Sequence, residues 1–149
     1  MKKMKLSNLV LLFTILLLVS FKSDKDKMHK RVFKVTVTDY KDGKPKAKTS
    51  DDEIEFKDGK LFSLYIFDKT GFEKIKYEIK IDSTYIDDEM TKEYIKIEAT
   101  SKNDGNEDLY LSMIIDDFNA EGSVKLMKSG REKKYFEFIG KEKVHKKGH

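Results

Sequence analysis

The sequence predicts an all-β protein in which an antiparallel meander of eight strands closes into an up-and-down barrel. Three observations lead to this fold class. From Arg31 onward apolar residues recur at every second position, short turn sequences separate the runs, and no ten-residue stretch has a helical period. Short links make consecutive strands neighbours, and eight such strands can close and so remove both sheet edges. A two-sheet β-sandwich is the alternative.

The expected strands follow one another between recognisable turns. The first alternates Phe33 and Val35 with polar residues, and the second ends at Asp58-Gly59, a pair typical of a tight hairpin. Asn103-Asp104-Gly105-Asn106 and Ser129-Gly130 mark two later turns. The eight expected strands cover or include residues 33–37, 54–57, 61–67, 75–81, 95–99, 109–115, 120–126 and 135–140.

Two longer links interrupt this spacing, at residues 41–50 and 83–91. The first is rich in lysine, and we expect it to be a loop. The second begins with Ser83 and Thr84, which are good helix caps, and continues with three acids at 87–89. We therefore expect one helical turn in the second link.

The N-terminal residues 1–23 have the pattern of a secretory signal peptide. Lys2, Lys3 and Lys5 precede an apolar core from Leu9 to Val19. This core is shorter than the roughly 20 residues that a transmembrane helix needs. We expect a periplasmic or secreted protein with no transmembrane domain after signal cleavage; an uncleaved N-terminal anchor is the rival interpretation.

The remaining chain is expected to form one domain. Of the 149 residues, we assign 24–30 to a charged N-terminal linker, 31–140 to a single β-barrel domain and 141–149 to a basic, flexible C-terminal tail. The absence of Cys excludes disulfide scaffolds, thiolate metal sites and cysteine nucleophiles.

The net charge of +4 does not indicate an anionic partner. Four of the 31 basic residues lie in the signal segment and seven in the two tails, so residues 31–140 carry 20 basic and 24 acidic residues. Lysines alternate with acids along the strands, and the chain has only two arginines, Arg31 and Arg131. Because nucleic-acid binding needs a clustered basic excess, we expect no nucleic-acid partner.

Three expected strands are apolar on both faces, at residues 61–67, 109–115 and 135–139. Such strands need cover on both sides, from a partner sheet, a terminal segment or another chain. A homodimer or an envelope protein is the expected partner in the last case. The alternative is that Tyr65, Tyr110 and Tyr135 are scattered surface aromatics.

In its turns and strand spacing the chain resembles lipocalin-like, calycin-type barrels and small secreted bacterial proteins of that shape. The resemblance covers residues 54–143 and rests on Phe56-Lys57-Asp58-Gly59, Gly122-Ser123-Val124 and the closing run 135–140. It implies an up-and-down barrel. The chain departs from lipocalins in having no Trp, hence no Gly-x-Trp motif, and no cysteine bridges.

We expect no catalytic residues, no metal site and no cofactor. His29, His145 and His149 all lie outside the expected strands, so a Ser-His-Asp arrangement has no base in the barrel. A hydrolase using paired carboxylates is the alternative, although neighbours on a strand point in opposite directions. The acidic loops at 87–89 and 103–108 leave calcium binding open, but the second lacks EF-hand spacing.

The candidate binding site is therefore the barrel interior, which can be filled by side chains or left open for one small apolar or amphipathic ligand. We expect a non-enzymatic exported protein that binds such a ligand. The alternative is a structural or protein-interaction module with a filled core. The expected ligand-binding residues are Phe33, Val35, Phe56, Ile75, Tyr77, Ile97, Ala99, Leu111, Met113, Gly122, Phe136 and Phe138.

Overall fold

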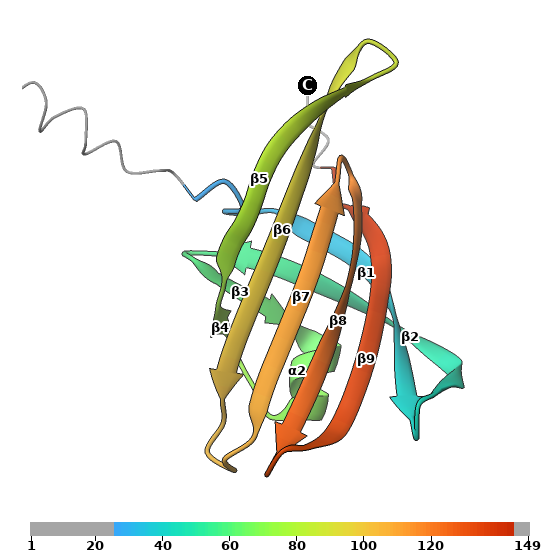
Figure 1. Ribbon diagram of the computed structural model, residues 1–149, viewed down its shortest axis with the longest axis vertical. Helices are drawn as coiled ribbons and strands as arrows, with labels where there is room; N and C mark the ends of the chain where they lie inside the picture. Colours follow the sequence, from blue (N-terminus) through green and yellow to red (C-terminus); the bar gives the residue numbers. More distant parts are fainter. Residues whose placement is uncertain (1–25, 145–149) are drawn as a thin grey trace, which may run out of the picture.

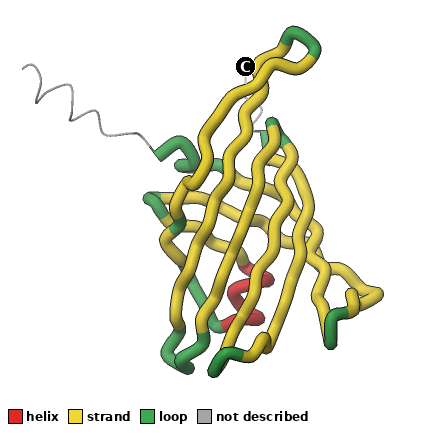
Figure 2. Tube along the Cα trace, viewed as in Figure 1, coloured by secondary structure: helices red, strands yellow, loops and turns green. Residues whose placement is uncertain are grey.

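The computed structural model describes residues 26–144, which form one antiparallel sheet with a single short helix (Figures 1 and 2). The proposed signal peptide and residues 145–149 lie outside the described residues. The elements are β1 (Val32–Lys41), β2 (Lys44–Lys57), β3 (Lys60–Ser63), α2 (Leu64–Thr70), β4 (Ile75–Lys76), β5 (Glu78–Asp87), β6 (Met90–Lys102), β7 (Asp108–Asp116), β8 (Asn119–Lys128) and β9 (Arg131–Glu142).

The sheet is a meander that curls into a nearly closed barrel, which confirms the predicted fold class. The strand order is β4-β3-β2-β1-β9-β8-β7-β6-β5, and each neighbouring pair is antiparallel. The order departs from the chain sequence only where β1 pairs with β9, so the first and last strands lie side by side (Figure 1).

The other side of the barrel is bridged by one interrupted strand. Only Tyr77 separates β4 from β5, yet β4 pairs with β3 while β5 pairs with β6. The nine strands therefore correspond to the eight predicted ones, with Ile75–Asp87 divided in two. Within residues 26–144, β5 has no second neighbouring strand, so its free edge forms one side of the remaining seam.

The predicted strand at residues 61–67 is wrong in its second half. β3 stops at Ser63, whose hydroxyl accepts a hydrogen bond from the backbone N–H of Ile66 at 3.2 Å and so caps α2. The helix ends at Gly71, which has φ 77°, a left-handed conformation that glycine adopts without strain. These two caps outweigh the β-forming residues between them.

The predictions for the two long links are also wrong. Residues 41–50 do not form a loop, because a turn at Asp42-Gly43 leads directly into β2 at Lys44. Residues 83–91 form a hairpin and not a helical turn, with Asp87 paired to Met90 across the ladder. A single helical turn is costly to nucleate, so the capping residues alone do not produce a helix here.

Gly140 lets β1 approach β9 closely. A Cβ at this position would lie 1.9 Å from the carbonyl oxygen of Lys34 and 2.6 Å from the Cα of Val35. Only a residue without a side chain fits at position 140 when β1 and β9 are this close together.

Candidate functional site

The residues predicted to line the barrel interior do point inward and come together. Ten of the twelve are buried, and Tyr77 and Gly122 are half-buried. The inward side chains belong to one continuous apolar core, in which Phe56 meets Phe33 and Tyr77 edge-to-face at centroid distances of 6.0 and 5.0 Å. Close packing of this kind is typical of a filled protein interior.

Gly122 does not leave room for a ligand. A Cβ on Gly122 would lie 2.4 Å from Cζ of Phe138 and 2.3 Å from the carbonyl oxygen of Ser112. The space that the missing side chain would occupy is thus already taken by a neighbouring ring and by the adjacent strand. Whether the interior accepts a ligand stays a prediction.

A short N-terminal segment, residues 26–31, covers one end of the barrel. Met28 is fully buried and belongs to the core cluster. Two residues before Met28, Asp26 accepts hydrogen bonds from the N–H of Gly59 at 3.1 Å and from the hydroxyl of Tyr77. We call residues 26–31 the plug. The expected boundary between linker and domain at residue 30 stays a prediction, but Met28 packs as a core residue.

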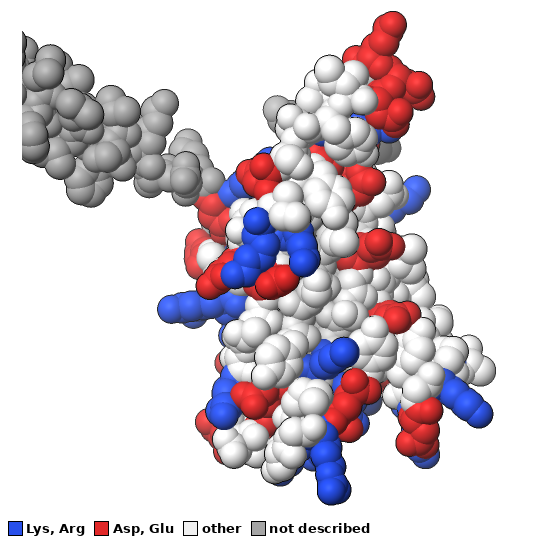
Figure 3. Space-filling model, viewed as in Figure 1, with Lys and Arg blue, Asp and Glu red and all other residues white. Residues whose placement is uncertain are grey.

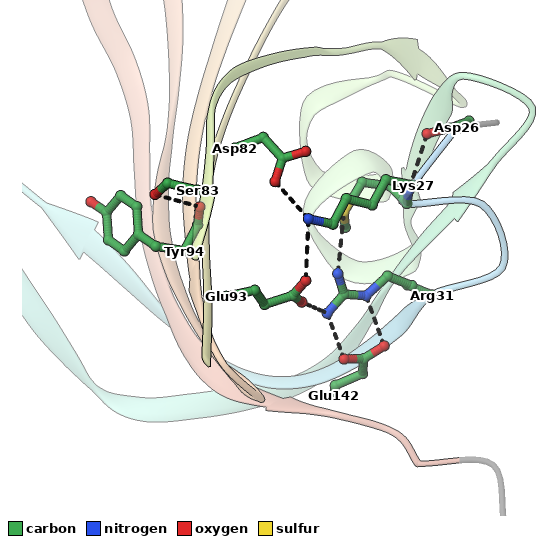
Figure 4. Close-up of polar contacts among 9 residues, drawn as sticks. Asp26, Lys27, Arg31, Asp82, Ser83, Glu93, Tyr94 and Glu142 are labelled. Carbon is green, nitrogen blue, oxygen red and sulfur yellow. Dashed lines mark hydrogen bonds and ion pairs between the residues drawn. The ribbon is translucent and has the colours of Figure 1, made fainter. Parts of the chain in front are cut away.

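Ion pairs hold the plug in place (Figure 4). The Arg31 guanidinium forms two hydrogen bonds with Glu142, at 2.8 and 2.6 Å, and contacts Glu93 at 2.5 Å. Lys27 donates to Asp82 at 2.5 Å. Burial works against the charge on Arg31, but the hydrogen bonds to Glu142 and Glu93 outweigh it and raise the Arg31 pKa. The plug therefore connects β5, β6 and β9.

The plug has no recognisable signal in the sequence, because a single methionine among charged residues has no periodicity. Tyr77, in contrast, was expected inside. Burial first, and then the hydrogen bond to Asp26, raise the pKa of the Tyr77 phenol. This hydroxyl stays protonated at any physiological pH and acts as a donor to the plug.

A large hollow lies on the outer face of the barrel. It encloses about 870 Å³ and is lined by residues of α2 and of β1, β2, β3 and β9. We call it the outer groove. Its apolar part is made by Phe62, Leu64, Tyr65 and Ile139, and Leu64 and Ile139 are 70% and 64% exposed. Gly140, which has no side chain, contributes to the lining.

The rest of the outer groove is acidic. Its charged lining residues are Lys34, Asp51, Asp52, Glu53, Glu55 and Asp68. Asp52 is buried, and its carboxylate binds the start of α2. It accepts hydrogen bonds from the hydroxyl of Ser63 and from the N–H of Tyr65, the latter at 3.1 Å. Within residues 26–144 no ion pair reaches Asp51, Glu55 or Asp68. The groove thus offers an apolar surface beside uncompensated carboxylates.

A second hollow of about 540 Å³ adjoins the groove and shares Thr36 and Ile139 with it. Hydroxyl side chains line it, together with Glu121 and Glu137. Glu137 accepts hydrogen bonds from the hydroxyls of Tyr40 at 2.6 Å and Tyr135 at 2.9 Å. These two bonds lower the Glu137 pKa.

Asp51 and Asp52, neighbouring carboxylates on β2, do not point to the same side of the sheet. Asp51 is exposed while Asp52 is buried, because neighbours on a strand face opposite sides. His29 lies at the surface and accepts from the N–H of Asp58 at 3.3 Å. Among residues 26–144, no three His, Cys, Asp or Glu side chains are grouped so that they could hold a metal ion.

The loop at residues 103–108 is a closed turn. The Asn103 side chain accepts from the N–H of Glu107 and donates to its carboxylate, both at 3.0 Å.

In the described part of the chain, no helix has the length and apolar character needed to cross a membrane.

Comparison with protein-family models, with curated proteins and with solved structures finds no match to this chain. The barrel agrees with the lipocalin-like shape that the sequence suggested, and the likeness extends to fold alone.

Proposed function

We propose that this protein is a non-enzymatic binding module with a filled core, which holds a cationic, amphipathic polypeptide segment in the outer groove. One observation carries the proposal: the inward side chains pack as a single core, while a hollow of about 870 Å³ with apolar and acidic walls lies outside. The proposal corresponds to the interaction module that the sequence left open beside a carrier of small ligands.

The chemistry of the groove selects the partner. Apolar side chains of a partner can cover Leu64 and Ile139, and lysine or arginine can reach Asp51 and Glu55 at the rim. Exposed apolar residues close together often mark interaction sites. The rim carboxylates add specificity and speed of association more than affinity. A neutral lipid would leave these carboxylates without a counter-charge.

The proposal is tested with a peptide probe and with a fatty-acid probe. A capped peptide Lys-Leu-Lys-Leu-Lys-Leu is titrated by calorimetry, with Glu-Leu-Glu-Leu-Glu-Leu and Lys-Ser-Lys-Ser-Lys-Ser as controls. We expect only the first to bind, and we expect Ile139→Ser and the pair Asp51→Asn with Glu55→Gln to weaken it several-fold. The control substitutions are Tyr110→Ser and Glu132→Gln. Tyr110 is an exposed aromatic residue on the outside of the barrel, and neither residue lines the groove.

A dansylated undecanoic acid serves as the probe for a carrier. Stoichiometric binding of this fatty acid that survives the groove substitutions would support the interior site and overturn the proposal. Equal binding of all three peptides would also overturn the proposal, because the groove would then show no preference for a peptide that is both cationic and amphipathic.

The proposed location, periplasmic or secreted, rests on the charge and hydropathy of residues 1–23. Intact-mass spectrometry of the protein purified from its envelope or medium tests it. Loss of about the first 20 residues supports export by a cleaved signal, and an intact N-terminus supports the anchor.

A further inference from the structure

The hairpin between β5 and β6 stands away from the rest of the barrel (Figures 1 and 2). The ladder between β6 and β7 ends at the pair Tyr94 and Asp116, so residues 84–92 form a two-stranded ribbon beyond the last neighbour. Two-stranded ribbons gain little stability in water by themselves. We call residues 84–92 the ribbon.

The ribbon exposes apolar side chains that nothing in the described residues covers. Ile86 and Met90 are 78% and 60% exposed, and they flank the tip on its two strands. The tip is acidic, as the red surface at the top of Figure 3 shows. Lys92 pairs with Asp87 at 2.5 Å, whereas Asp88 and Glu89 make no ion pair within residues 26–144.

The opposite end of the barrel has the complementary character. A hollow of about 320 Å³ lies beside the β1–β2 and β8–β9 hairpins, and we call it the basic mouth. Five lysines and one carboxylate line it, together with three tyrosines and a phenylalanine. The lining residues are Asp39, Tyr40, Lys41, Lys46, Tyr65, Lys69, Lys133, Lys134, Tyr135 and Phe136.

Not all of these lysines are compensated. Lys46 pairs with Asp39 at 3.1 Å and Lys133 pairs with Glu107 at 2.7 Å. Among the described residues, no carboxylate pairs with Lys41, Lys69 or Lys134. Lys134 donates to the backbone carbonyl of Lys69, and the Lys69 ammonium lies 5.7 Å from the centre of the Tyr65 ring. The mouth therefore combines lysines that have no carboxylate partner with half-buried tyrosines.

We propose that the ribbon of one copy inserts into the basic mouth of the next, so that the protein associates head to tail. Asp88 and Glu89 would face the lysines, and Ile86 and Met90 would pack against the exposed parts of the half-buried tyrosines. Both halves of the contact lie on the same chain, which selects a second copy over an unrelated partner.

The symmetry of such a contact has a definite consequence. The ribbon and the mouth lie at opposite ends of the barrel, because the β5–β6 turn is at one end of the strands and the β8–β9 turn at the other (Figure 1). A heterologous contact of this kind leaves a free ribbon and a free mouth on each open assembly, which grows as a chain unless the rotation between copies closes it into a ring. The exposed charges are screened at high salt, where the Debye length falls to about 3 Å at 1 M.

The experiment uses two variants that each lose one half of the contact. Asp88→Asn with Glu89→Gly removes the tip charges while installing Asn-Gly, which suits the positive φ of both residues and so keeps the turn. Lys69→Glu with Lys134→Glu reverses two exposed lysines of the mouth. Glu98→Gln with Glu121→Gln makes the same charge change as the first variant on another face.

The masses are measured by sedimentation velocity on the protein as purified from cells, at 20 mM and 500 mM NaCl. We expect the wild type and the Glu98/Glu121 variant to grow beyond dimers with concentration at low salt and to return to monomers at high salt. Each contact variant alone should stay monomeric. An equimolar mixture of the two should stop at a 1:1 dimer, because one retains only its mouth and the other only its ribbon.

Three results would overturn the proposal. These are a wild type that stays monomeric at millimolar concentration in 20 mM NaCl, a wild type that stops at a dimer, and a mixture of the two variants that grows past a dimer or does not associate. Circular dichroism of each variant checks that the barrel is intact.

Discussion

Replacement of Met28 by alanine tests whether the plug is part of the folded domain. The Met28 side chain is fully buried in the core, and truncation of a buried methionine to alanine costs about 2–5 kcal/mol. The plug is short and closes an open end, so part of the gap can collapse. We therefore expect a loss of about 2–3 kcal/mol in the free energy of unfolding.

The assay is equilibrium unfolding in urea followed by far-ultraviolet circular dichroism, at low protein concentration. Met90→Ala is the matched control, because Met90 is exposed on the ribbon, and it should change the stability by less than about 0.5 kcal/mol. Met28→Leu conserves volume and should cost less than about 1.5 kcal/mol. If Met28→Ala and Met90→Ala are equally stable, residues 26–31 do not contribute to the core and the reasoning fails.

Three further predictions concern the sheet, the helix and a carboxylate. Gly140→Ala should cost about 3 kcal/mol or more, because its Cβ would overlap the Lys34 carbonyl, whereas Gly105→Ala, with Asn103 Oδ1 at 3.3 Å, should cost less than about 1 kcal/mol in the same urea assay. Asp52→Asn should cost about 1–2 kcal/mol and speed amide exchange at Tyr65 and Ile66, while Asp51→Asn, on the exposed side of β2, should do neither; equal exchange in the two variants would contradict the capping role. The Glu137 carboxyl should titrate below its ordinary pKa in carbon-detected NMR, and Tyr40→Phe should raise that pKa, because its hydroxyl donates to the carboxylate. Since the folded-state pKa of Glu137 is the lower one, its contribution to stability is present above the unfolded pKa and is lost as the pH falls through the folded value; an unchanged titration in Tyr40→Phe would refute this.

The alternation of apolar and polar residues was enough to predict most of the barrel. Phe33, Val35 and Val37 lie inside as expected, because a period of two leaves a strand only one way to bury its apolar face. The run at 61–67 is apolar at both parities, so the pattern could not decide between strand and helix. The decision is made partly by Asp52, a residue of another strand, and a single-sequence pattern does not contain that contact.

The outer groove shows the same limit more strongly. Its walls come from β1, β2, β3, β9 and α2, and the β9 wall joins the others because β1 pairs with β9. The sequence did indicate that residues 135–139 are apolar on both faces, and Ile139 is the outward residue that the groove uses. The register that places Ile139 opposite Thr36 depends on the whole meander and could not be read from either strand alone.

The pairing of β1 with β9 also determines when the barrel can form during synthesis. β1 is made first, but its partner begins at Arg131, so one edge of β1 stays open until nearly the whole domain has emerged. The β1–β2 hairpin and the β5–β8 ladder can form earlier from local contacts, while closure waits for the most distant ones. Glu142, the last residue of β9, then meets Arg31 and locks the plug. A chain that has not yet added β9 is consequently an open sheet, and the barrel can close only when β9 has been made.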